Sequence, residues 1–402
     1  MLIRHTLITI ILSLFLFGCS EDKSVNLPDP YMAEGDGVFV ESNARRALEG
    51  IEEDNLLFNN NFKEGDKLYF SQKGTGASGI PNFSNISNPL NPVYIYEYQE
   101  NLAASWSSGY NFVKSTIDGN AATEFDWDNV IGVGPDGNTF KFFAFYFPYD
   151  NNIRWNVEKD QTGGEEDIYS ISNLLKSDIC GAYHATSALY TRLRFRLFHL
   201  MTYLKVTIYV PVFNVTQNDY NDQSYSGFND DALLGAYMMN AITDFTIDWS
   251  ANRSSDTDAP LVQTSASSSK DNIKMYLHKV SDENKTEVIN VREFYSGQVD
   301  DIVGNSDEVR AYTFSVIFPT QTVEDNFLCF ALKTPGGDTK YYYFSGSQIL
   351  PTADSGYGLT QGTLQQLYLY LPRKTNQTIL IGAKILPWDG AITDMTVNKQ
   401  DQ

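Results

Sequence analysis

Residues 193–210 decide the fold, and they read Leu-Arg-Phe-Arg-Leu-Phe-His-Leu-Met-Thr-Tyr-Leu-Lys-Val-Thr-Ile-Tyr-Val. In Leu193–Leu197 the apolar residues alternate with Arg194 and Arg196, so they share one face while the arginines face solvent. From Tyr203 to Val210 every second residue is aliphatic. Side chains of a β-strand point to opposite faces in turn. The stretch therefore predicts β-structure with one buried face.

Similar segments recur along the whole chain, separated by clusters of Gly, Asn, Asp, Ser and Pro. Aromatic residues make up 14% of the chain, and Tyr and Phe favour half-buried strands. Helical periodicity is almost absent, and the two best candidates for short helices are Ile168–Leu175 and Asp231–Asn240. The pattern predicts an all-β protein of the β-sandwich type. The clearest predicted strands are Lys67–Phe70, Val93–Tyr98, Phe140–Phe147, Leu193–Val210, Ile242–Asp248, Ile273–His278, Val309–Phe318, Phe327–Leu332, Lys340–Phe344, Gln366–Leu371 and Thr378–Ile385.

The chain has 402 residues, which is enough for two domains of ordinary size. A polar, glycine-bearing stretch between Asn151 and Ala188 separates two strand-rich halves. Ala251–Lys270, rich in Ser, Asp and Thr, predicts a long surface loop. The predicted parts are a signal peptide (1–18), a tether (19–36), an N-terminal β-sandwich (37–178) and a C-terminal β-sandwich with a tail (179–402).

The N-terminus has the pattern of an export signal. One cation, Arg4, precedes the apolar run Leu7–Phe17, and Gly18-Cys19 ends it. The run is shorter than the roughly 20 apolar residues that span a bilayer. Its end resembles a bacterial lipobox, in which the cysteine is acylated. This resemblance implies a protein held by lipid on Cys19 to the outer membrane. Ser20-Glu21-Asp22 resembles an acidic surface-export tag, or is an ordinary acidic leader.

Net charge and cysteine content limit the partners and the cross-links. The formal net charge is −21, which argues against nucleic acid and anionic membrane surfaces as partners, because both attract basic patches. Besides Cys19 the chain has only Cys180, in a loop-like stretch, and Cys329, in an apolar run typical of a buried strand. Pairing of these two is open, and buried free thiols are the commoner outcome.

The sequence contains no motif for catalysis, and we expect no enzyme activity, metal or cofactor. Of the histidines, His184, His199 and His278 follow the export signal, and none has the spacing of a zinc site. His199 is expected to be a core or interface residue whose ring bonds a backbone carbonyl. No nucleophile elbow, phosphate-binding loop or dinucleotide fingerprint occurs where a strand feeds a helix.

Two weaker candidates stay open. Asp126 and Asp128 flank Trp127, which is either a sugar-stacking site or a turn whose indole packs inward. Residues 219–224 carry oxygen-bearing side chains at the first and third positions, but lack the glycine and glutamate of a calcium-binding EF-hand loop. Adventitious calcium on that loop remains open.

The order of the segments resembles the fimbrillin family, the type V pilin subunits and related surface lipoproteins of Bacteroidota. The resemblance implies two tandem transthyretin-like β-sandwiches and a structural or adhesive role in a surface fimbria. Partners would be other fimbrial subunits, joined by strand addition, and host or bacterial surface ligands. Six elements carry it along the chain: Lys63–Phe70, Asn91–Tyr96 with Trp106, Phe140–Pro148, Leu193–Val206, Phe314–Thr320 and Thr378–Trp388.

In pilins of this family an Arg-directed protease separates the lipidated leader from the mature subunit. Arg46-Ala47 occupies the matching place, although Arg45-Arg46 is equally readable as a solvated dibasic pair. The strand before it is expected to fill an edge groove that a partner's tail occupies after cleavage. The predicted displaced strand is Val38, Phe39 and Val40, and the predicted donor tail carries Ile392, Met395 and Val397.

The alternative from another class is a carbohydrate-binding surface lipoprotein of a glycan-uptake system, with a glycoside hydrolase as a more distant third. A glycan-binding face requires a cluster of exposed Trp or Tyr. The five tryptophans are spread one per segment, so the sequence alone predicts no such cluster; they are Trp106, Trp127, Trp155, Trp249 and Trp388.

Overall fold

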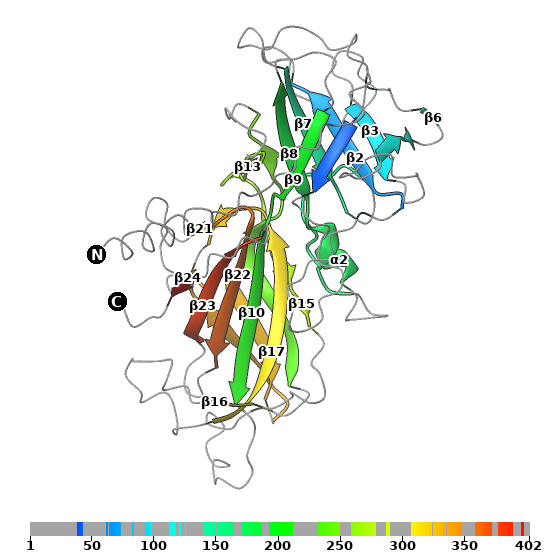
Figure 1. Cartoon of the computed structure of the whole chain (residues 1–402). Coiled ribbons are helices and arrows are strands. Elements are labelled where there is room, and N and C mark those ends of the chain that lie inside the picture. Colours follow the sequence, from blue (N-terminus) through cyan, green and yellow to red (C-terminus); the bar gives the residue numbers. More distant parts are fainter. Residues whose placement is uncertain are drawn as a thin grey trace, which may run out of the picture.

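The computed structural model shows an elongated molecule with two strand-rich parts, one above the other (Figure 1). The residues that the structure describes are 38–42, 62, 64–73, 83, 93–98, 112–117, 120–121, 125, 140–148, 152–163, 171–186, 193–211, 228, 232–249, 259–278, 287–289, 307–323, 325–334, 336–346, 358–371, 377–388 and 395–397. Strands dominate them, with the short helix α2 (Ser172–Lys176), so the all-β prediction is confirmed. No helix within these ranges is long and apolar enough to cross a membrane.

The first part is a single sheet of seven strands. Its edge strands, β1 and β4, also lie near each other, so the sheet curls until its two edges approach. A two-stranded ribbon of β5 (Thr116–Ile117) and β6 (Asn120–Ala121) follows β4. In spatial order the strands are β1 (Val38–Ser42), β9 (Leu193–His199), β8 (Cys180–Thr186), β7 (Phe140–Tyr146), β2 (Lys67–Gln72), β3 (Val93–Tyr98) and β4 (Phe112–Lys114).

Both faces of this sheet are buried. On one face alternate residues form an aromatic core of their own, for example Phe70 against Phe195 with ring centroids 5.2 Å apart. On the other face Phe143 and Phe145 pack against Trp155 and Trp249 and join the larger core that continues into the second part. This explains why β7 is a nearly continuous apolar run, because a strand buried on both faces needs no polar side.

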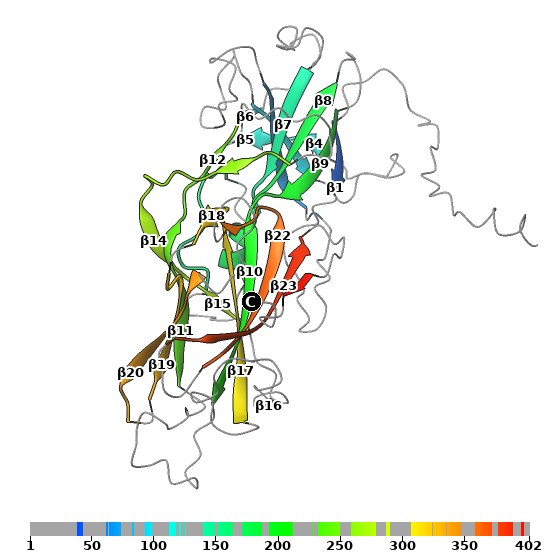
Figure 2. The ribbon, with the colours of Figure 1, turned by 90° about the vertical axis from the view of Figure 1, so that its left-hand side faces the viewer.

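The second part is a sandwich of two sheets, seen edge-on in Figure 2. Phe314 of one sheet meets Phe330 of the other with ring centroids 5.9 Å apart. One sheet contains β15 (Tyr276–Leu277), β17 (Asp307–Phe318), β10 (Thr202–Pro211), β22 (Thr363–Tyr370), β23 (Ile379–Pro387) and β24 (Met395–Val397), with β16 (Glu287–Ile289) also on β17. The other contains β14 (Lys270–Lys274), β11 (Leu233–Ile242), β19 (Leu328–Lys333) and β20 (Thr339–Phe344).

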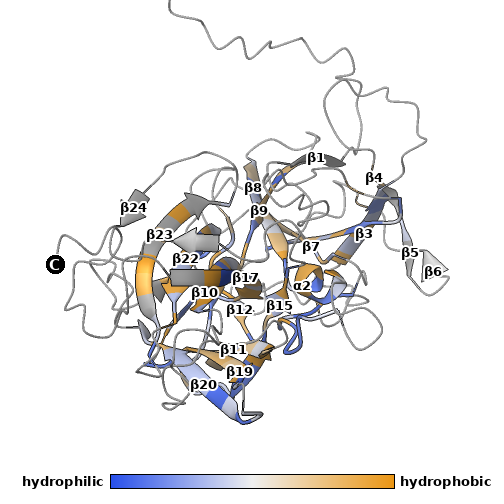
Figure 3. Cartoon of the chain, turned by 90° about the horizontal axis from the view of Figure 1, so that it is seen from below, coloured by the Kyte–Doolittle hydropathy of each residue, from blue (hydrophilic) through white to orange (hydrophobic). Residues whose placement is uncertain are grey.

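Seen from below, β11 and β23 carry clear hydrophobic stretches, while β20 carries much of the hydrophilic colour (Figure 3). Two short ribbons complete this part of the described chain: β12 (Thr246–Ile247) with β13 (Val262–Gln263), and β18 (Gln321–Thr322) with β21 (Gly358–Leu359). β13 lies in the stretch predicted to be a surface loop.

The change from the first sheet to the second falls at Leu200-Met201, between β9 and β10. β8 pairs with both β7 and β9, so residues 180–199 complete the first sheet. The predicted division after residue 178 would separate these strands from that sheet. The polar composition of the stretch between Asn151 and Ala188 suggested a boundary after residue 178, whereas the pairing of β8 and β9 assigns residues 180–199 to the first sheet. The arrangement as two tandem transthyretin-like domains stays a proposal.

Residues 152–163, predicted to separate the two halves, are held firmly between them. Gln161 is fully buried, and its side chain pairs with the backbone of β17 like another strand. Its Nε2 donates to the Ile317 carbonyl at 2.6 Å, and its Oε1 accepts from the Ile317 N–H at 2.8 Å. The backbone N–H of Gln161 also donates to the Lys274 carbonyl. The segment therefore connects the two parts through specific pairing.

One helix prediction is wrong. Asp231–Asn240 contains Leu, Ala and Met, which are good helix formers, but residues 233–242 form β11. This strand pairs with β14 on one side and β19 on the other, and Ala236 and Met238 point into the core. Tertiary pairing outweighs local propensity here. The other predicted helix is present as α2, which begins at Ser172; residues 168–170 lie outside the described ranges.

Candidate functional site

The free edge of the first sheet is occupied by β1, which contains the predicted displaced strand Val38, Phe39 and Val40. β1 runs parallel to β9, with Val38 opposite Leu193 and Ser42 opposite Leu197. The connection between two parallel neighbours must cross over, so these five residues come from a distant place in the chain. β1 is thus the outermost strand at this edge, and within the described residues it pairs only with β9.

The strand next to β1 in the sheet, β9, carries part of the aromatic core. Leu193, Phe195 and Leu197 are fully buried, which confirms the alternation expected from the sequence. Arg196 is partly exposed and lies over the Phe198 ring, with its guanidinium carbon 5.4 Å from the centroid. If β1 left, β9 would become the edge and would present unpaired N–H and C=O groups above this core.

The predicted donor tail lies at an edge of the second sheet. Met395 and Val397 belong to β24, which pairs antiparallel with β23 and sets Ile385 opposite Met395. In this structure the tail therefore completes its own sheet. Donation to another subunit, which stays a prediction, would require it to detach. Cys19, Arg46, Ala47 and Ile392 lie outside the residues that the structure describes.

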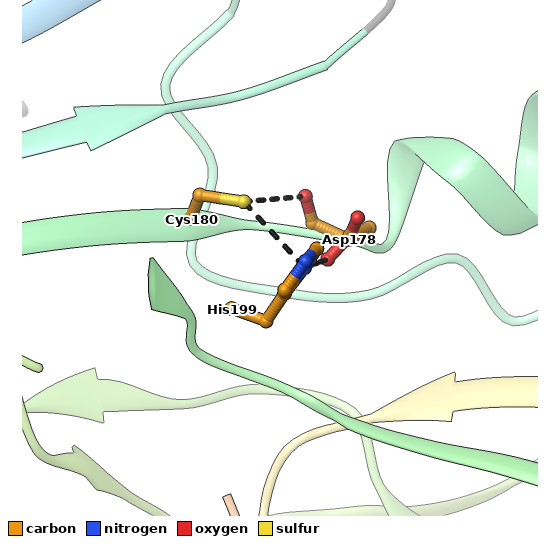
Figure 4. A group of neighbouring side chains, drawn as sticks. All are labelled: Asp178, Cys180 and His199. Atoms are coloured by element: carbon orange, nitrogen blue, oxygen red, sulfur yellow. Dashed lines mark hydrogen bonds and ion pairs between the residues drawn. The ribbon is translucent and has the colours of Figure 1, made fainter. Parts of the chain in front are cut away.

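A second site lies at the junction between the two parts, where Asp178, Cys180 and His199 meet (Figure 4). Asp178 follows α2, Cys180 begins β8 and His199 ends β9. The pairing of Cys180 with His199 across the two strands brings them together. His199 Nδ1 lies 2.7 Å from Asp178 Oδ1 and 3.8 Å from Cys180 Sγ.

The cluster is buried among aromatic side chains. Asp178, Cys180 and His199 are each at most 1% exposed. Trp388, which directly follows β23, stacks on the His199 ring with centroids 4.2 Å apart and planes 4° from parallel. The Tyr203 ring also stacks on Trp388, with centroids 5.3 Å apart. The cluster thus joins residues of both parts of the molecule.

His199 is a core residue, as predicted, and the partner of its Nδ1 is the Asp178 carboxylate. The prediction of a loop around Cys180 is wrong, since this residue begins a buried strand. A catalytic triad places the nucleophile and the carboxylate on opposite nitrogens of the imidazole. Here Sγ and Oδ1 both face Nδ1, so the described geometry contains no such relay.

Among the described residues, no disulfide joins Cys180 and Cys329. Both are free and buried, and Cys329 lies in β19 as the apolar pattern predicted. Burial raises the pKa of the Cys329 thiol to about 11, and the nearby Tyr343 side chain lowers it by less. The thiol is therefore protonated at neutral pH, which makes it a poor nucleophile.

A buried polar chain extends from Tyr203 through Ser315 to His278. The Tyr203 hydroxyl lies 2.9 Å from Ser315 Oγ, which in turn lies 2.6 Å from His278 Nε2. Burial lowers the pKa of His278 to about 3, with repulsion from Lys205 as the smaller cause. His278 is accordingly neutral at physiological pH and accepts or donates a hydrogen bond without charge. Burial also raises the pKa of Tyr203.

The outer face of the four-stranded sheet carries a cluster of tyrosines. Tyr237 and Tyr343 flank Cys329 in register across three strands, and Tyr341 lies two residues along β20. Tyr341 is 50% exposed, as is Leu234 nearby on β11. The small side chain of Cys329 between the tyrosines is almost completely covered. This tyrosine face is the kind of exposed aromatic cluster that the sequence analysis did not find, because its members lie on different strands.

The fold and these sites define an all-β chain whose first sheet ends in an added edge strand and whose two parts share a buried junction. No protein family profile and no curated protein matches the sequence. Similar solved structures include a candidate cell adhesion protein from Bacteroides uniformis, which is 13% identical; the match covers 88% of this chain and 100% of that one, with a TM-score of 0.38.

Two further solved structures show the same level of similarity. A candidate cell adhesion protein from Bacteroides ovatus is 10% identical over 88% of this chain and 97% of its own, with a TM-score of 0.42. The tip fimbrial protein Mfa3 from Porphyromonas gingivalis is 11% identical over 81% of this chain and 95% of its own, with a TM-score of 0.33.

Proposed function

We propose that this chain is a structural or adhesive subunit of a surface fimbria, made as a precursor that lipid on Cys19 holds at the outer membrane and assembled by β-strand addition. The observation that carries the proposal is the position of β1. It is an edge strand, it pairs with β9 alone in the described part of the chain, and it precedes the Arg46-Ala47 bond by only a few residues.

The physical logic follows from the pairing. Cleavage after Arg46 would cut the only covalent link between β1 and the rest of the subunit. The five-residue parallel ladder would then be held by noncovalent contacts alone, and a short strand of this size dissociates easily. The vacated edge of β9 would offer backbone groups over the buried Leu193, Phe195 and Leu197. An extended segment of a neighbouring subunit satisfies these groups by strand addition.

The test is the N-terminus of the protein isolated from its native cell surface, determined by mass spectrometry beside denaturing gels of the fimbriae. Processed subunits would begin at Ala47 and form detergent-resistant ladders. Arg46→Lys, which removes the arginine at the cut, should keep β1 attached and abolish the ladders. Arg45→Lys, a matched control that leaves Arg46-Ala47 intact, should behave like the wild type.

Intact chains with acylated Cys19 inside assembled fimbriae would overturn strand release and leave the role of a membrane-held anchor or accessory subunit. Ladders that persist in Arg46→Lys would refute cleavage at this bond. Because the two readouts are independent, a lipidated and uncleaved protein that never assembles would refute the fimbrial role as a whole.

The second candidate is binding of neutral glycans, and the tyrosine face specifically favours it. Aromatic rings on a sheet surface offer their faces to the apolar side of a sugar ring. A glycan array probed with the full chain would test this, with Tyr341→Ala expected to reduce binding. The matched control is Tyr368→Ala, a partly buried tyrosine on β22. Equal binding by both variants would exclude the tyrosine face as a glycan site.

A further inference from the structure

The Asp178–Cys180–His199 cluster brings together three different side-chain groups that bind metal ions. One carboxylate oxygen, one thiol sulfur and one imidazole nitrogen lie within 4.8 Å of one another (Figure 4). The second carboxylate oxygen, Asp178 Oδ2, is buried and has no hydrogen-bond partner among the described residues. A buried carboxylate oxygen without a partner is costly, which indicates that the site satisfies it in some other way.

The distances are close to those that a tetrahedral ion requires. Zinc lies about 2.3 Å from a cysteine sulfur and about 2.0–2.2 Å from histidine nitrogen or carboxylate oxygen, which separates neighbouring ligands by roughly 3.3–3.6 Å. The Sγ–Nδ1 distance of 3.8 Å is near this range, and the Nδ1–Oδ1 hydrogen bond of 2.7 Å is shorter. Opening that bond by about half an ångström, with a small turn of the carboxylate, would bring the three atoms to the spacing of three of the four ligands of a tetrahedral ion.

Charge balance points to the same occupant. A divalent ion bound by one thiolate, one carboxylate and one neutral imidazole forms a neutral group. Neutrality matters here because all three residues are at most 1% exposed, and an isolated charge in such a place is strongly disfavoured. Thiolate with imidazole is a ligand set that suits zinc and other ions of similar softness.

We propose that Asp178, Cys180 and His199 bind a single zinc-class divalent ion. The ion replaces the proton of the Cys180 thiol and the hydrogen bond at His199 Nδ1, and the neutral imidazole keeps its single proton on Nε2, so no oxidation or reduction is involved. The ion enters during folding, because the folded ligands are closed to solvent. It acts as a structural clamp that holds the start of β8 and the end of β9 at the junction, under the stacked Trp388.

The ligand spacing, Asp-x-Cys followed 19 residues later by His, matches no short zinc motif. For that reason the sequence predicted no metal. Only the pairing of β8 with β9 places Cys180 opposite His199. This inference does not depend on the proposed fimbrial function, since a structural ion would serve an anchor or a glycan-binding protein equally well.

The test uses cobalt(II) as a spectroscopic probe. The full chain carrying Cys19→Ala and Cys329→Ala retains Cys180 as its single thiol, because the sequence has three cysteines. After unfolding and refolding with cobalt(II), we expect one ion per chain and a thiolate-to-cobalt charge-transfer band. Adding Cys180→Ala should remove the band, and Asp178→Asn should weaken cobalt binding. Far-ultraviolet circular dichroism checks that each variant folds.

Absence of the band in the folded double variant would overturn the proposal, whatever the further variants do. A band that survives Cys180→Ala would also overturn it, because the thiolate would then not be a ligand. A separate readout uses the wild type: zinc present during refolding should raise the melting temperature, and magnesium should not. Equal melting temperatures with both ions would contradict a zinc-class site.

Discussion

The amide of Gln161 offers a sharp test of how the two parts of the molecule are joined. Gln161→Ala removes the side chain that donates to the Ile317 carbonyl and accepts from the Ile317 N–H. The backbone bond from Gln161 to the Lys274 carbonyl is untouched. The substitution therefore removes the bonds of the amide, which include one from Nε2 to the Glu158 carbonyl, and keeps the backbone bond to β14.

The magnitude follows from the groups left behind. Each buried backbone group without a partner costs about 1–3 kcal/mol, so the two groups of Ile317 together cost about 2–6 kcal/mol. Entry of water into the space left by the side chain would lower this, and we expect about 2–4 kcal/mol. A local loss of about 2 kcal/mol speeds amide exchange roughly 30-fold, because each 1.4 kcal/mol corresponds to a factor of ten.

Hydrogen exchange measured by mass spectrometry on peptides from β17 is the assay, since it reports on the Ile317 amide itself. Gln263→Ala is the matched control, because Gln263 is exposed on β13 and its amide donates to the Asp248 carboxylate at the surface. We expect no change in β17 exchange for this control. Equal exchange of β17 in both variants would show that Gln161 does not stabilise the strand and would refute the reasoning.

Three further predictions concern pH, backbone strain and the core. The pKa of His278 falls from an ordinary value of about 6.5 to about 3 on burial, so its contribution to stability is complete above pH 6.5 and is lost as pH falls toward 3. His278→Gln should therefore flatten the fall in stability measured by urea unfolding between pH 6.5 and 4; an unchanged slope would contradict the assignment. Gly362→Ala should destabilise the protein by about 1–3 kcal/mol, because φ of Gly362 is +69° and the new Cβ would lie 3.3 Å from the His199 carbonyl oxygen. A melting temperature equal to that of the wild type would contradict this expected strain. Phe195→Ala should lower the free energy of unfolding in urea by about 3–5 kcal/mol, because the Phe195 ring is fully buried in the aromatic core of the first sheet. A loss below about 1 kcal/mol would show that the first sheet does not depend on this core.

The alternation of side chains within single segments was sufficient to predict most strands. Leu193, Phe195 and Leu197 are buried as their spacing required, and the apolar run around Cys329 forms a buried strand. Strand periodicity is local, since each residue's face depends only on its neighbours along the chain. The all-β class therefore followed from the sequence.

Pairing between strands distant in the sequence decided the features that the local side-chain pattern did not predict. Residues 233–242 have helix-forming composition but become β11, because two strands distant in the sequence pair with its edges. Gln161 belongs to a polar stretch and is nevertheless fully buried, because its side-chain amide makes the two backbone hydrogen bonds to Ile317 of β17 that a neighbouring strand would make. The sequence of a single segment does not show which distant group will pair with its backbone.

The candidate sites divide in the same way. The position of Val38–Val40 ahead of Arg46, and of Cys19 after an apolar run, belongs to the sequence, because these features depend on order along the chain. The meeting of Asp178 with His199, and of Tyr237 with Tyr343 across three strands, belongs to the tertiary structure. The physical reason is that short-range order sets which face a side chain occupies, whereas sheet register, chosen by the whole core, sets which distant side chain lies beside it.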